Sequence, residues 1–200
     1  MLVNYGSKVS CTDIRVTSAS RAPVRALAEY LETIRFSEPT SGSDKFLVVK
    51  DGKADVEDIA DYPAAVVYAE GPVRYGLEDG ALEPVDMLDI EGARAVMVGE
   101  INMTVLVHVW TNEDEHREIV LQALEDAFSP VEWMSGFQLE MPHYYNCRAQ
   151  YQLSEMVFED SPDDVQRRYR KLSAQLTVRS PYVRLFSIPK LEPRNRVEVG

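Results

Sequence analysis

The sequence has few cysteines and no long apolar segment. Its 200 residues include two cysteines, Cys11 and Cys147, which lie far apart and in no metal-binding spacing. We expect free thiols in a reducing compartment, with a single disulfide between them as the alternative. No run of about 18 apolar residues is present, which excludes a membrane-spanning helix. The first residues, MLVNYGSKVSCTDIRV, contain no apolar segment of the secretory type, so we expect no signal peptide.

Motifs for cofactor binding and nucleophilic catalysis are missing as well. The chain contains neither G-x-G-x-x-G nor a phosphate-binding P-loop, and no serine or cysteine lies in a G-x-S-x-G context. The glycines of GPVRYGLEDG are surrounded by acidic residues, which would repel a phosphate group. The sequence therefore predicts no cofactor and no catalytic residues of these types.

Histidine is also scarce, and two of the three histidines flank one informative segment. Glu113 and His116 have the i, i+3 spacing that places two side chains on one face of a helix, and His108 ends the apolar run before them. A metal-dependent enzyme that uses these three residues is the alternative we considered. A single Glu-x-x-His lacks the second ligand helix of a di-metal centre, and acidic residues favour the first turn of any helix. We interpret the segment as a strand-to-helix joint and predict no metal site and no enzymatic activity. His143, which follows Pro142, is interpreted as a packed or hydrogen-bonded side chain.

Positive charge is scarce over most of the chain. The formal net charge is −12, yet residues 161–200 carry nine Lys or Arg against four Asp or Glu, which leaves −17 on residues 1–160. An acidic body argues against a nucleic-acid-binding domain, and the basic end could pair with another copy or an acidic partner. The candidate intersubunit or partner contacts are Arg167, Arg168, Arg170, Lys171, Glu113 and Asp114. The other interpretation of the arginine cluster, RRYRK at residues 167–171, is a strand face exposed to solvent.

Apolar periodicity predicts one helix and three strands in the first half of the chain. The helix covers residues 21–35, and the strands cover residues 45–49, 63–70 and 95–110. We expect the second strand to end at Gly71-Pro72, and residues 73–95 to form a long excursion. The last of these strands alternates between an apolar face and a half-polar face, so it should be buried mainly on one side.

The second half is predicted to contain one helix and further strands. Residues 113–128 carry a single apolar stripe at helical spacing. Residues 144–158 alternate as a half-buried strand does, and we prefer a strand to a helix for residues 169–179. Another short strand is expected over residues 182–188.

These elements predict an α+β fold. We expect a mixed or antiparallel sheet with two main helices packed on one face and a C-terminal β extension. Residues 1–19 would form an N-terminal arm and residues 20–130 the α+β core. Residues 131–200 would form a β-rich extension that belongs to the same domain or makes an arm.

The order of two segments resembles the tail terminator family of long-tailed bacteriophages. The segments are YPAAVVYAEGP and, after a gap, INMTVLVHVWTNEDEHREIVLQALEDAF. In such proteins a helix precedes a proline-led strand, and a long aliphatic strand leads into a helix that begins with acidic residues. The resemblance covers roughly residues 20–128. It implies a structural virion protein of the tail or neck, assembled in the host cytoplasm, with no catalytic residues, no cofactor and no contact with membranes.

The resemblance also implies partners. Similar proteins form rings, commonly hexamers, that cap the tail tube and present a surface to the head-completion or neck proteins. DNA would only pass through the lumen, and in contractile tails the sheath is a further contact. This sequence departs from the pattern because about 70 residues follow the second helix. That extension leaves room for another virion role, such as a head–tail connector or a baseplate protein.

Overall fold

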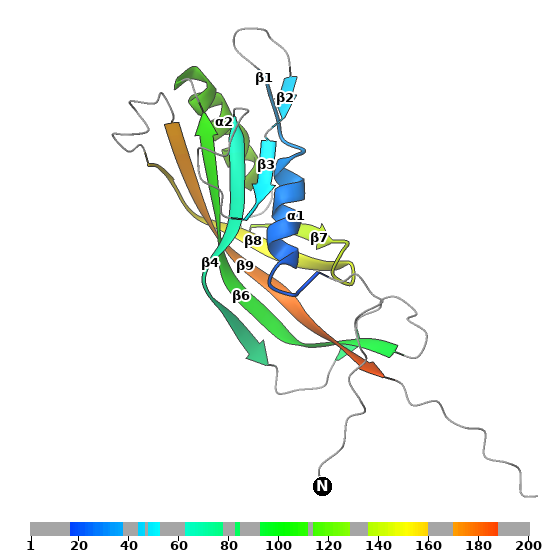
Figure 1. Ribbon diagram of the computed structural model, residues 1–200. Helices are drawn as coiled ribbons and strands as arrows, with labels where there is room; N and C mark the ends of the chain where they lie inside the picture. The colour runs from blue at the N-terminus through cyan, green and yellow to red at the C-terminus, as the bar shows by residue number, and fades with distance from the viewer. Residues whose placement is uncertain are drawn as a thin grey trace, which may run out of the picture.

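The computed structural model contains a large, mostly antiparallel sheet with two helices (Figure 1). It describes residues 17–37, 44–46, 48–52, 63–77, 83–84, 93–111, 114–128, 136–159 and 170–187. Most of the predicted arm, residues 1–19, lies outside these ranges, and so does the end of the chain from residue 188. The predicted α+β class, with both helices on one face of the sheet, is confirmed.

The sheet is built around two long strands, β6 (Ala93–Thr111) and β9 (Arg170–Ser187). They pair with each other, β4 (Ala64–Leu77) lies on the other side of β6, and β8 (Cys147–Phe158) lies on the other side of β9. The edges are β7 (Phe137–Met141), antiparallel to β8, and β3 (Val48–Asp51), parallel to β4. A short strand, β5 (Glu83–Pro84), also pairs with β6, and β1 (Arg35–Ser37) pairs with β2 (Asp44–Phe46) in a separate small sheet. The strands of the predicted C-terminal extension therefore join the strands of the predicted core in one sheet.

Both helices cover the same face of the large sheet. Helix α1 (Ala22–Leu31) has Pro23 in its first turn, where the missing N–H costs no helical hydrogen bond. Helix α2 (Asp114–Phe128) buries Val120, Leu124 and Phe128, as its apolar stripe predicts. The helices meet where the Tyr30 hydroxyl donates a hydrogen bond to the carbonyl oxygen of Ala127 at 3.2 Å.

The core lies between these helices and one face of β6. Residues at alternate positions of β6 are buried there with the helix side chains: Ile101, Met103, Val105, Val107 and Val109. The intervening positions point to the opposite face, so the predicted one-sided burial of this strand is confirmed. We call this opposite face, turned away from α1 and α2, the open face. It carries a small buried cluster of Ala64, Val66 and Trp110, with Tyr68 packed against it.

The predicted end of a strand at Gly71-Pro72 and the excursion over residues 73–95 are wrong in part. Strand β4 continues to Leu77 through an irregularity between Glu70 and Arg74, after which it pairs again with β6. Gly71 adopts φ +70, a conformation that suits glycine, so the Gly-Pro pair forms a bulge inside a strand instead of a stop. Strands β4, β6 and β9 thus extend beyond the helices as a ribbon of residues 74–77, 93–102 and 179–187 (Figure 1).

The other corrections concern the C-terminal strands. Strand β8 begins at Cys147 and not at residue 144, because Pro142 to Asn146 form a turn in which Tyr145 and Asn146 have positive φ. The strand before this turn, β7, was not predicted. Strand β9 is one continuous strand where two were expected.

Pro181 can lie inside β9 because the neighbouring strand has already ended. The last paired residue of β9 on the β8 side is Arg179, opposite Gln150. The N–H of Val183 points to this side, where it donates to the Tyr144 hydroxyl at 2.8 Å, and Pro181 has the same orientation. The missing N–H of Pro181 therefore interrupts no ladder hydrogen bond.

Candidate functional site

The open face carries a hydrogen-bonded cluster of polar and aromatic side chains near the end of β6 that leads into α2. We call it the open-face cluster, and its members come from β4, β6, β9 and the residue after β8: Tyr68, His108, Trp110, Glu159, Lys171 and Ser173. Cross-strand register brings them together, since His108 pairs with Val66 on one side and Ser173 on the other. Residues that pair across antiparallel strands share a face, so four separate segments build one site.

His108 is held between two aromatic rings. Its Nε2 lies 3.1 Å from the Tyr68 hydroxyl, and the Tyr68 and Trp110 ring centroids lie 5.3 Å and 5.7 Å from the imidazole. Burial and the nearby Lys171 ammonium lower the pKa of His108 from 6.5 to about 4, against a smaller opposing effect of Glu159. The imidazole is therefore neutral at physiological pH, and it accepts or donates one hydrogen bond without charge.

Glu159 is the anionic member of the cluster. It accepts a hydrogen bond from the Ser173 hydroxyl at 2.6 Å, and it forms an ion pair with Lys171 Nζ at 2.9 Å. These contacts, that of Ser173 first, lower the pKa of Glu159. The Ser173 hydroxyl donates to this carboxylate and not to an imidazole, so the two side chains do not form the serine–histidine pair of a serine nucleophile. The arrangement is a network on the open face in which two aromatic rings flank a neutral imidazole beside an ion pair.

The pH dependence of stability offers a direct check on His108. Below about pH 6.5 the unfolded chain binds a proton at this residue, whereas the folded chain does so only near pH 4. We therefore expect the free energy of unfolding to fall as the pH is lowered from 6.5 to 4, and His108→Gln to weaken that dependence. Denaturation in urea across this range measures the effect, and NMR titration of the imidazole measures its cause. A titration midpoint of His108 at or above 6.5 would contradict the assignment.

The predicted contact residues are only partly within the described structure. Arg167, Arg168 and Glu113 lie outside it. Arg170 is the first residue of β9, opposite Thr111, and Asp114 is the first residue of α2. Lys171 is half-buried in the open-face cluster, where its partner is Glu159 of the same chain.

The histidines considered as metal ligands are separated by the fold. His108 points to the open face, and His116 is buried on α2, which packs against the other face. Within the described residues, no group of three or more His, Cys, Asp or Glu side chains could hold a metal ion. Cys147 is buried as a free thiol, and burial raises its pKa to about 11, so it is not poised as a nucleophile.

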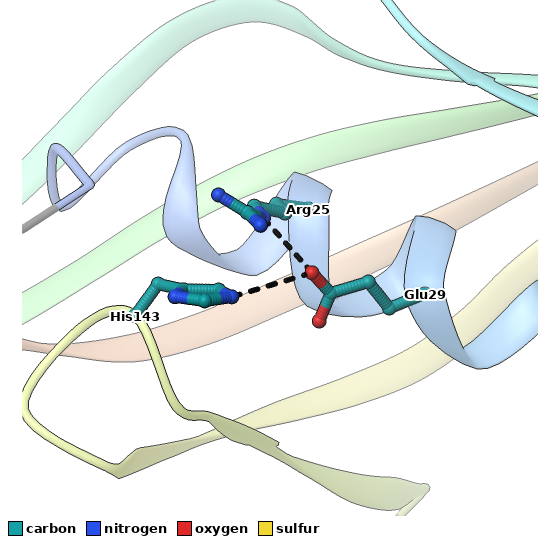
Figure 2. Close-up of polar contacts among 3 residues, drawn as sticks. All are labelled: Arg25, Glu29 and His143. Atoms are coloured by element: carbon teal, nitrogen blue, oxygen red, sulfur yellow. Dashed lines mark hydrogen bonds and ion pairs between the residues drawn. The ribbon is translucent and has the colours of Figure 1, made fainter.

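His143 lies in the turn between β7 and β8. Figure 2 shows its imidazole directed at Glu29 of α1, with Nε2 and Oε1 separated by 3.7 Å. The same carboxylate oxygen accepts a hydrogen bond from Arg25 Nε at 2.8 Å. The three side chains are roughly half exposed, so this group ties the turn to α1 at the surface and adds little stability.

A shallow groove of about 420 Å³ lies on the open face beside the β4 bulge. It is lined by Glu70, Arg74, Asn102, Thr104, Gln175 and Thr177, and also by Gly71, Pro72 and Met103. The polar side chains offer hydrogen-bond donors and acceptors, and the shallow shape suits contact with a protein surface better than enclosure of a small ligand.

Comparison with known protein families and with curated protein sequences found no match. None of the helices in the described part of the chain is both long and apolar enough to cross a membrane.

Proposed function

We propose that this protein is a structural virion protein that forms a ring of identical copies, as phage tail terminators do. The ring would cap the tail tube and join the tail to the neck. The order of elements supports this proposal: α1 precedes β4, which starts after Pro63, with β1, β2 and β3 between them, and β6 leads into the acidic start of α2. That order is the basis of the resemblance to the terminator family.

One structural observation carries the proposal, namely the ribbon that β4, β6 and β9 form beyond the helices (Figure 1). Tyr75 on this ribbon is 53% exposed, which is more than any other large hydrophobic side chain among the described residues. A projecting set of strands with an exposed aromatic side chain adds little to the stability of a monomer, but it provides an anchor for a neighbouring subunit.

The charge distribution supports the assigned partners. A net charge of −12 disfavours tight binding to DNA, so DNA would pass through the ring lumen without being held. The proposed protein partners are the tail tube, the head-completion or neck proteins and, in a contractile tail, the sheath. The proposed ring is a hexamer, in keeping with the terminator family.

Two measurements test this proposal. Light scattering on the purified protein should give a discrete oligomer of six copies. Electron microscopy with tail tubes should place the ring at the tube end that faces the head. A protein that stays monomeric and does not associate with tubes would refute the proposal, and a ring at the baseplate end or on the head portal would assign it another virion role.

A further inference from the structure

The ribbon carries an aromatic and cationic patch on the side from which the helices project. Tyr75 of β4 and Tyr182 of β9 pack edge to face with ring centroids 5.2 Å apart, although β6 runs between their strands. Gly99 of β6 pairs with both Leu77 and Tyr182, and its lack of a side chain leaves room for the two rings. The guanidinium of Arg184 lies 5.4 Å from the Tyr182 ring, and its Nε donates to the Tyr182 hydroxyl at 3.2 Å. We call Tyr75, Tyr182 and Arg184 the ribbon patch.

The ribbon as a whole is cationic in its exposed side chains. On the side of the ribbon opposite the ribbon patch, Arg74 and Arg179 flank Asn102. With Arg184 they make three exposed arginines. Glu100 is the exposed carboxylate of the described ribbon side chains. Arg184 is the charged member of the ribbon patch, so a partner of the patch should present negative charge.

The outer surface of α2 has that charge. The helix contains five acidic residues and a single arginine. Glu118, Glu125 and Asp126 are exposed on the side away from the buried stripe, and we call these three residues the acidic face. The spacing of Glu118 and Glu125 places them two turns apart on one line along the helix. Arg117, the one basic residue, is turned instead onto the Phe158 ring at 3.5 Å.

The two surfaces lie at opposite ends of the sheet and cannot meet within one molecule. The ribbon contains the first half of β6, and α2 begins just after the last residue of β6, Thr111 (Figure 1). Strand β6 has 19 residues and spans roughly 60 Å. Complementary surfaces at opposite ends of a subunit are what a head-to-tail contact requires, and such a contact gives a ring when its rotation closes.

We propose that the ribbon patch of one copy docks on the acidic face of α2 of the next copy. This inference rests on the proposed function, since it assumes that copies associate. Tyr75 and Tyr182 would supply rigid apolar area, and Arg184, already oriented by Tyr182, would pair with the Glu125 or Asp126 carboxylate. The attraction between the two surfaces makes assembly sensitive to salt, because the charges that meet lie near the protein surface.

Charge reversal tests this contact. Arg184→Glu and Glu125→Arg should each weaken self-association, with the apparent dissociation constant rising at least about tenfold. Combining both substitutions in one chain should restore assembly. An equimolar mixture of the two single variants should also assemble, because each variant then offers the surface that the other lacks, and an even-numbered ring can alternate them. Sedimentation velocity at fixed protein concentration and low salt provides the readout.

Matched control variants show whether a loss of assembly comes from the contact itself or from a folding defect. Arg148→Glu and Glu32→Arg reverse exposed charges outside both surfaces and should leave the oligomer unchanged. Thermal unfolding of every variant verifies that it is folded. If the wild type forms rings that the single reversals leave intact, or if the combined variant does not reassemble, the contact is wrong while the ring stands. A wild type that is monomeric at all concentrations removes the ring and the contact together.

Discussion

Replacing Tyr151 by alanine is expected to lower the free energy of unfolding by about 3–5 kcal/mol. Tyr151 is completely buried and is among the largest side chains in the core. Its ring stacks on Phe137 with centroids 5.2 Å apart, and its hydroxyl donates a hydrogen bond to the carbonyl oxygen of Pro23 at 2.8 Å. One side chain of β8 therefore holds the edge strand β7 and the first turn of α1, and its removal leaves a cavity where these elements meet.

A second variant separates the contribution of the Tyr151 ring to stability from that of its hydroxyl group. Tyr151→Phe keeps the stacking and removes a single buried hydrogen bond, which leaves the Pro23 carbonyl without its partner at a cost of about 1–3 kcal/mol. Denaturation in urea measures both free energies of unfolding. The exposed Gln152→Ala on the same strand serves as the control and should change stability by no more than about 0.5 kcal/mol. Equal losses for the alanine and phenylalanine variants would show that packing of the ring contributes nothing, contrary to our expectation.

The long regular elements could be predicted from local sequence because their burial is periodic. In β6 the alternation from Ile101 to Val109 specified both the strand and its buried face, and in α2 the stripe that ends at Phe128 did the same. A side chain that must be buried repeats every second residue in a strand and every third or fourth in a helix, so these patterns need no knowledge of the partner.

Elements that depend on a partner strand were missed or misplaced. Gly71-Pro72 has the composition of a turn, but pairing with β6 on both sides of the bulge keeps the chain extended to Leu77. The five residues of β7, FQLEM, alternate between apolar and polar side chains, but a pattern this short also fits other local structures, and pairing with β8 makes it a strand. Local turn signals and short segments are the features that tertiary pairing overrides most readily.

The candidate site was harder to predict from the sequence than the strands and helices were. The sequence placed His108 on the half-polar face of its strand, which is where the structure has it. Its neighbours Tyr68, Ser173 and Glu159 come from segments far away in the chain, and only the register of β4, β8 and β9 assembles them. Register depends on the whole sheet, so no spacing within one segment could indicate this cluster. The arginine cluster indicated that Lys171 makes a charged contact, but it did not indicate that the partner of Lys171 is Glu159.

Gly136→Ala is the second substitution from which we expect a large effect. Gly136 immediately precedes β7 and adopts φ +94, a conformation that side-chain-bearing residues rarely accept. A Cβ at this position would overlap the carbonyl oxygen of Tyr151 and approach its carbonyl carbon to 3.0 Å. Both neighbours are backbone atoms of β8, so no side chain can move aside. We expect a loss of about 2–5 kcal/mol in the free energy of unfolding, from the strained φ and the overlap together.

Gly71→Ala is the matched control for this substitution. Gly71 also has a positive φ, +70, but a Cβ there would meet no atom within 4 Å. It should therefore cost only the conformational part, about 1–2 kcal/mol. Urea denaturation gives the loss in free energy of unfolding for each variant. The difference between the two losses measures the effect of the overlap alone. Hydrogen exchange should localise it, with faster exchange of the β7 amides and of their β8 partners in Gly136→Ala only. Equal destabilisation by the two substitutions would mean that β7 can move away from β8 without cost, and that Phe137 does not need its place between Phe128 and Tyr151.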